Sequence, residues 1–112
     1  LDDDGLLLAA LRVLLPPYRG DGLSLLRGEQ AGRYGAGKLG FGWTPKRKAA
    51  EMFASGLCAS YDGGGVLLEA TAPARAIIAG PSAHSGWLDE HEHVVDPSRL
   101  TNIRPVAWFP QN

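Results

Sequence analysis

Residues 40–54 constrain the fold of this chain more than any other segment. They run Gly-Phe-Gly-Trp-Thr-Pro and then Lys-Arg-Lys-Ala-Ala-Glu-Met-Phe-Ala. Pro45 suits the first turn of a helix, where its missing N–H costs nothing, and Thr44 before it is a typical N-cap. Four apolar side chains then follow at helical spacing: Ala49, Ala50, Phe53 and Ala54. The segment predicts a strand end that turns into a capped helix, with Trp43 and Thr44 at the junction.

The composition indicates a small domain made of short elements. Fifteen glycines and eight prolines among 112 residues predict many turns and few long helices. We expect one domain over residues 1–112, with an N-terminal helix within residues 1–17 and a core over residues 18–112. Eleven lysines and arginines against twelve acidic residues leave the chain near neutrality, which argues against general binding to nucleic acids or anionic membranes.

Hydropathy and cysteine content argue against several other classes of protein. No apolar run approaches the ~20 residues of a membrane-spanning helix. The leucine-rich run over residues 6–15 is too short, and the acidic residues 2–4 before it are the wrong flank for a signal peptide. We therefore expect a soluble protein, either cytoplasmic or a secreted or translocated effector. The single cysteine, Cys58, excludes an internal disulfide and a multi-cysteine zinc site, and it is expected to be a buried apolar residue.

Periodicity and turn residues predict an α+β fold with a largely antiparallel sheet. The leucine stripe predicts a helix that ends at Pro16 and Pro17. Residues 29–40 are expected to form a glycine-rich basic loop. Short strands are expected at residues 23–27, 66–72, 76–79, 87–96, 102–104 and 106–109, with Arg27 at the end of the first.

Three motifs occur in a fixed order over residues 26–97. The first is Leu-Arg-Gly-Glu at residues 26–29, and the second is the junction described above. The third is Glu-His-Glu at residues 90–92, which continues into Val-Val-Asp-Pro at residues 94–97. Together they resemble the R-S-E motifs of the ADP-ribosyltransferase superfamily. The resemblance implies two small sheets of short, mostly antiparallel strands around a cleft that binds NAD, with one or two helices.

The resemblance gives the first motif two roles in holding NAD. The guanidinium of Arg27 would pair bidentately with the pyrophosphate. Gly28 has no side chain, so its backbone N–H and C=O could hold the nicotinamide carboxamide. Tyr18-Arg19-Gly20 has the same local pattern, so Arg19 remains an alternative for the motif arginine, although Arg27 ends an apolar run and lies closer to the junction.

The junction would shape the nicotinamide pocket. The family usually has serine or threonine where this chain has Gly42, a hydroxyl that steadies the catalytic glutamate, and Thr44 could partly cover that role. Trp43 and Phe53 could stack against the nicotinamide, but large aromatic residues at such a junction also commonly belong to the core.

Alternation on a strand places Glu90 and Glu92 on one face. The resemblance implies that Glu92 hydrogen-bonds the ribose 2′-OH and stabilises the oxocarbenium-like transition state as nicotinamide leaves. Glu90 would orient or deprotonate the nucleophile, and a glutamate at that position accompanies arginine modification in the family. The acceptor stays open: an arginine or other protein side chain, a small molecule, a nucleic acid or water. The alternative is a catalytically inactive relative that binds a nucleotide or a protein partner.

Two competing motifs are weaker. His91 and His93 have metal-ligand spacing and could recruit Asp96 or His84, but the remaining ligands lack a regular spacing, so no metal is expected. Residues 35–40 match Gly-x-Gly-x-x-Gly, yet no strand leads directly into them and no helix follows at once, as a dinucleotide fingerprint requires.

Overall fold

The computed structural model describes residues 3–15, 18–80 and 92–112. The α-helices are α1 (Asp3–Leu14), α2 (Ala31–Gly35) and α3 (Arg47–Ser55). The strands are β1 (Leu23–Gln30), β2 (Gly42–Trp43), β3 (Gly65–Ala72), β4 (Ile77–Ala79), β5 (His93–Val95) and β6 (Thr101–Phe109). Short 3₁₀ turns, Cys58–Ser60 (η1), Ala74–Ala76 and Pro97–Arg99, connect some of these elements.

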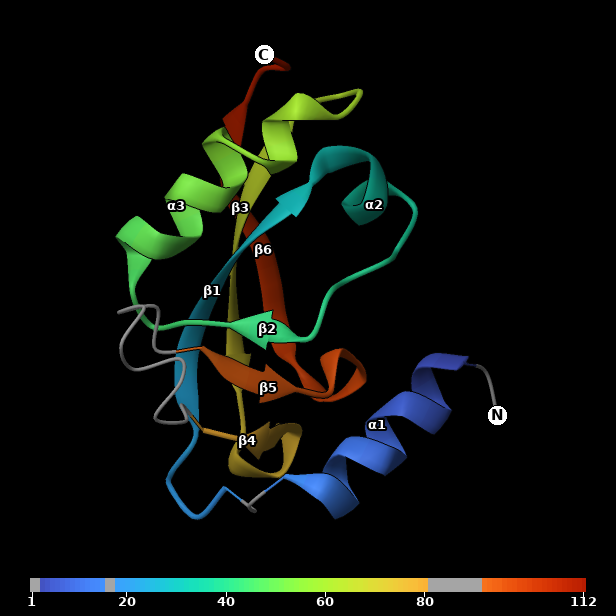
Figure 1. The fold of residues 1–112 in the computed structure, drawn as a ribbon. Helices are drawn as coiled ribbons and strands as arrows, with labels where there is room; N and C mark the ends of the chain where they lie inside the picture. Colours follow the sequence, from blue (N-terminus) through green and yellow to red (C-terminus); the bar gives the residue numbers. More distant parts are fainter. Residues whose placement is uncertain (1–2, 16–17, 81–91) are drawn as a thin grey trace.

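The strands form two sheets of three strands each (Figure 1). The order is β1-β3-β6 in the first sheet and β2-β5-β4 in the second, and every pairing is antiparallel. The expected α+β class with two small antiparallel sheets is therefore confirmed.

Strand β1 is longer than the sequence predicted. We expected it to end at Arg27, but it pairs with β3 through Gln30, which lies opposite Gly65. Arg27 and Gly28 therefore lie inside the strand. The first residues of the expected loop belong to β1, and the next ones form α2. Because alternate residues of a strand share a face, Arg27 and Glu29 project from the same side of β1.

Strand β3 is the centre of the first sheet and matches its prediction. Its first four residues are buried, as expected for a strand that is covered on both faces. The core on one face contains Leu25, Trp43, Leu68, Ile77 and Val95, and a smaller cluster of Leu26, Leu67, Ala50 and Ala54 lies under α3. Figure 1 shows α3 against β1 and β3.

Strand β6 corrects the prediction of two separate strands. It runs without interruption from Thr101 to Phe109, and Pro105 lies within it opposite Leu68. The prediction failed because proline normally breaks a strand, whereas β6 is at the sheet edge and its register shifts beside Pro105.

The junction before α3 also differs from its prediction. Thr44 is not the N-cap: that position is Lys46, and the helix begins at Arg47. The Thr44 hydroxyl instead accepts a hydrogen bond of 3.1 Å from the Lys46 N–H. Of the expected apolar face, Ala50 and Ala54 are buried, whereas 42% of Phe53 is exposed.

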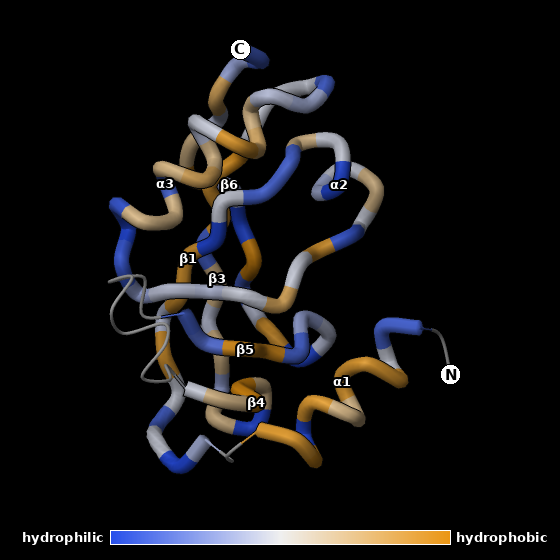
Figure 2. The backbone as a smooth tube through the Cα atoms, in the orientation of Figure 1, coloured by the Kyte–Doolittle hydropathy of each residue, from blue (hydrophilic) through white to orange (hydrophobic). Residues whose placement is uncertain are grey.

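Helix α1 confirms the N-terminal helix. Leu8 and Leu11 are half-buried toward the body of the protein, and no residue of α1 is fully buried. Figure 2 shows that α1 is mostly apolar between its acidic start and Arg12, and Leu6, Val13 and Leu14 are exposed. Within the described ranges, no helix combines the length and apolar character needed to cross a bilayer.

Candidate functional site

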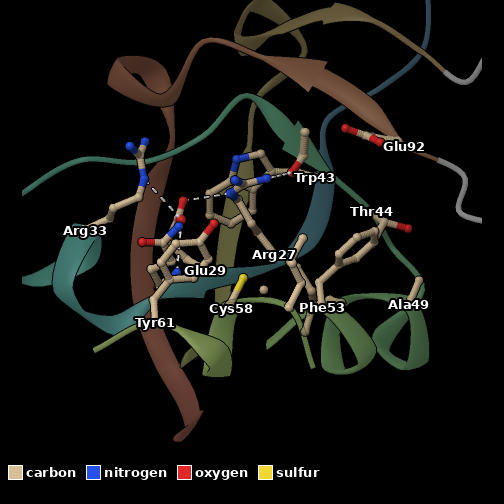
Figure 3. A pocket seen from close by; sticks show the side chains of 16 residues that line it. Arg27, Glu29, Arg33, Trp43, Thr44, Ala49, Phe53, Cys58, Tyr61 and Glu92 are labelled. Carbon is tan, nitrogen blue, oxygen red and sulfur yellow. Dashed lines mark hydrogen bonds and ion pairs between the residues drawn. The ribbon is translucent and has the colours of Figure 1, made fainter. Parts of the chain in front are cut away.

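A pocket of about 430 Å³ follows the edge of β1 that faces β2 and α3. Its lining comes from segments that are distant in the sequence. β1 contributes Leu26 to Gln30, and α3 with η1 contributes a wall that includes Phe53, Leu57, Cys58 and Tyr61. Arg33, Gly42, Trp43, Thr44 and Glu92 complete the lining (Figure 3).

The pocket begins where the two sheets meet. Leu26 and Thr44 exchange both backbone hydrogen bonds, N–H to C=O, at 2.7 and 2.8 Å. Beyond this bridge β1 pairs with β3, whereas β2 turns away to pair with β5. Since the backbone groups of residues two apart in a strand point the same way, Gly28 directs its N–H and C=O toward the pocket, as Leu26 does toward Thr44.

Gly28 is also required by the packing of α3. A Cβ atom at this position would lie 2.5 Å from the Ala50 oxygen, 2.5 Å from the Ala54 nitrogen and 2.9 Å from the Phe53 Cβ. The missing side chain therefore brings the helix directly onto β1, which sets the distance between these two walls of the pocket.

Arg27 lies at the centre of the pocket lining. Its Nε donates to Glu29 Oε2 at 2.9 Å, and its Nη1 donates to the Gly42 carbonyl at 2.9 Å. Its Nη2 lies beside Gly40, where any side chain would collide with the guanidinium. The side chain is 25% exposed, so the guanidinium is held in place and still reaches the pocket. The alternative arginine, Arg19, is exposed and does not line this pocket.

Glu29, which was not among the predicted site residues, is the buried acid of the site. It is 2% exposed, and its carboxylate also accepts from the backbone N–H of Gly40 at 2.9 Å and of Gln30 at 3.0 Å. Burial alone raises the pKa of Glu29. The charge and hydrogen bond of Arg27 and the two backbone N–H donors act in the opposite direction. Together they outweigh burial, so the pKa of Glu29 is lowered from its ordinary value. The i, i+2 spacing from Arg27 would have indicated this pair if the strand had been extended beyond residue 27.

Glu92 directly precedes β5 and is exposed, and it lines the pocket at the end near Thr44 (Figure 3). Its carboxylate lies over Gly42, in space that any side chain at position 42 would occupy. The register explains this position, because Gly42 pairs with Val94 and Trp43 with His93. Glu90 lies outside the described residues.

The aromatic residues of the junction have different environments. Trp43 is 1% exposed, belongs to the core, and donates from Nε1 to the Gly40 carbonyl at 3.0 Å. It is therefore a core residue with one side on the pocket rather than an open stacking surface. Thr44 is 7% exposed, whereas Phe53 projects into the opening of the pocket.

Cys58 lies in the pocket lining and is half-buried, so it is less buried than expected. Burial and, to a smaller extent, the charge of Glu29 raise the pKa of the Cys58 thiol, while Arg27 acts in the opposite direction. The thiol therefore stays protonated at neutral pH.

The competing metal and dinucleotide motifs do not form sites in the part of the chain that the structure describes. His93 is 6% exposed, and its ring meets the edge of Tyr18 with centroids 6.0 Å apart. No group of three or more histidine, cysteine or acidic residues suited to a metal occurs there, and His84 and His91 lie outside it. The glycine motif begins at Gly35, at the end of α2 rather than after a strand.

Comparisons with protein-family models, with curated proteins and with solved structures found no match for this chain.

Proposed function

We propose that this chain is an NAD-dependent mono-ADP-ribosyltransferase of the ADP-ribosyltransferase superfamily. It would cleave the bond between nicotinamide and ribose and transfer ADP-ribose to an acceptor, or to water. The observation that supports this proposal best is that Arg27, Gly28, Thr44 and Glu92 line one pocket, although they come from three separate segments of the chain.

The edge of β1 supplies the binding groups in this mechanism. The N–H of Gly28 donates to the carboxamide oxygen of nicotinamide, and its C=O accepts from the amide nitrogen, as a neighbouring strand would do. Arg27 offers a fixed positive charge for the pyrophosphate, because Glu29 and the Gly42 carbonyl already hold two of its nitrogens. Phe53 covers the opening with an apolar ring.

Glu92 supplies the charge that promotes cleavage. As the C1′–N bond breaks, its electron pair leaves with the nicotinamide and the ribose becomes cationic. A carboxylate near the ring stabilises that cation and can accept a hydrogen bond from the 2′-OH. The nucleophile then forms a bond to C1′ and loses its proton, a step in which Glu90 is expected to assist.

One observation favours the inactive alternative, a nucleotide-binding module. Gly42 cannot supply the hydroxyl that steadies the glutamate in the family, and the Glu92 carboxylate occupies the space of that side chain. Under this alternative the pocket binds NAD or a related nucleotide without cleaving it.

Nicotinamide release from NAD by the wild-type protein and by Glu92→Gln distinguishes the two functions. The substitution retains the shape of the side chain and removes the charge, so release should fall about 100-fold or more, the typical effect of removing one electrostatic group from a transition state. Glu69→Gln is the matched control, because that carboxylate pairs with Arg104 away from the pocket.

Alkylation of Cys58 by a neutral maleimide reports binding at this pocket separately, since Cys58 is the only cysteine and lies in the lining. NAD should slow alkylation in the wild type and in Glu92→Gln alike. Protection without release from the wild type would support the binding module. If the folded wild-type protein shows no protection by NAD and releases no nicotinamide, both functions are overturned.

A further inference from the structure

Two arginines share the buried carboxylate of Glu29 (Figure 3). Arg27 approaches Oε2 through its Nε at 2.9 Å, and Arg33 of α2 approaches Oε1 through its Nε at 3.3 Å. Both arginines line the pocket, with side chains 25% and 42% exposed. Glu29 itself is 2% exposed, so the two guanidiniums are attached to a fixed point in the protein.

Within the described residues, the terminal nitrogens of Arg33 make no other hydrogen bond, whereas those of Arg27 are partly engaged. One terminal nitrogen of a guanidinium faces the same side as its Nε–H, and in Arg27 this side packs beside Gly40. Arg27 Nη1 donates to the Gly42 carbonyl. The backbone N–H groups of Gly40 and Gln30 take further lone pairs of the carboxylate. Two positive charges and one negative charge leave this part of the lining with a net positive charge of one.

We propose that Glu29 is a positioning residue that holds Arg27 and Arg33 as a pair, and that Arg33 is a second contact for the diphosphate of a nucleotide ligand. One arginine satisfies a single phosphate, whereas two guanidiniums on one carboxylate suit two linked phosphates. The pocket then prefers a nucleoside diphosphate to the corresponding monophosphate. The inference deepens the proposed function, since NAD contains such a diphosphate, but it does not depend on cleavage.

The test is a binding titration with ADP and with AMP for the wild type, Arg33→Gln, Arg33→Lys and Arg47→Gln. Arg47 is the matched control, because it pairs with Glu51 along α3 and does not line the pocket. Arg33→Gln should weaken ADP binding about tenfold, the effect of one charge-assisted hydrogen bond, and should change AMP binding less than about threefold. Arg33→Lys should recover part of the ADP affinity, and Arg47→Gln should leave both affinities unchanged.

Glu29→Gln separates positioning from simple charge. If Glu29 only reduced the positive charge, its removal would tighten binding of both nucleotides. If it positions the arginines, the preference for ADP over AMP should fall even though the net charge rises. Should this variant not fold, as judged by its thermal melting, the Arg33 variants decide alone.

The outcomes are independent of the proposed function. Equal losses of ADP and AMP binding in Arg33→Gln, or no loss of either, would overturn the inference even if the protein releases nicotinamide. A selective loss of ADP binding would support it even if no nicotinamide is released. A wild-type protein that binds neither nucleotide would also overturn it.

Discussion

Replacement of Gly28 by alanine tests how closely α3 is packed against the pocket strand. The added methyl group would lie 2.5 Å from two backbone atoms of α3, the Ala50 oxygen and the Ala54 nitrogen. Backbone atoms cannot rotate away as the end of a flexible side chain can, so the helix has to move as a unit. The strand conformation at Gly28 is itself compatible with alanine, because its φ is not positive.

The expected cost follows from overpacking. Inserting a methyl group into a packed interior costs about 1–3 kcal/mol. The gain from replacing glycine in a strand is about 0.5–1 kcal/mol, so it offsets only part of that cost. Because the methyl group meets two backbone atoms at 2.5 Å, the cost lies at the upper end of that range and a net loss of about 2 kcal/mol remains. This corresponds to a decrease in Tm of about 10 °C for a domain near 100 residues.

Urea unfolding followed by circular dichroism measures this loss as a lower midpoint at unchanged slope. Gly35→Ala is the matched control, since nothing lies within 4 Å of a Cβ atom at that position, and its stability should change by less than about 1 kcal/mol. If Gly28→Ala unfolds at the wild-type midpoint, the contact between α3 and β1 is looser than described and the reasoning fails.

Two further predictions concern the carboxylates of the site. The lowered pKa of Glu29 contributes stability that is fully present above its unfolded value of 4.5 and is lost as the pH falls through the folded value. Glu29→Gln lacks this carboxylate, so its urea midpoint should change less with acid than that of the wild type. A side chain at position 42 displaces the Glu92 carboxylate at little cost in stability, because the end of that side chain is flexible. Gly42→Ala should therefore reduce nicotinamide release more than Gly42→Ser, whose hydroxyl can hold the carboxylate again, and a larger loss in the serine variant would contradict this role.

Local sequence signals predicted the elements that depend on local chemistry. The central strand β3 and the helix over residues 47–55 were placed within a few residues, because an apolar run and a helical apolar face each determine them directly. Arg27, Thr44 and Glu92 line one pocket, and their roles toward NAD stay predictions.

The sequence-based predictions failed where tertiary structure overrides local signals. Gly28 suggested a strand end, yet the glycine is needed because α3 packs against it, and β1 continues to Gln30. Pro105 suggested a break that an edge strand tolerates. Glu29 could not be identified once the strand was ended early, because its partners Gly40 and Arg33 come from outside β1.

The pairing of β1 with β3 also determines when the pocket can form during folding. These strands join across the whole segment 31–64, which carries β2 and α3, so closing the first sheet encloses both of the other pocket walls. Pairing that is so distant along the chain carries a loop-closure cost and is slower than the formation of local contacts. The site therefore forms only in the final native topology, when Arg27, the Gly28 backbone and the Glu92 carboxylate come together. No short fragment of the chain can carry it.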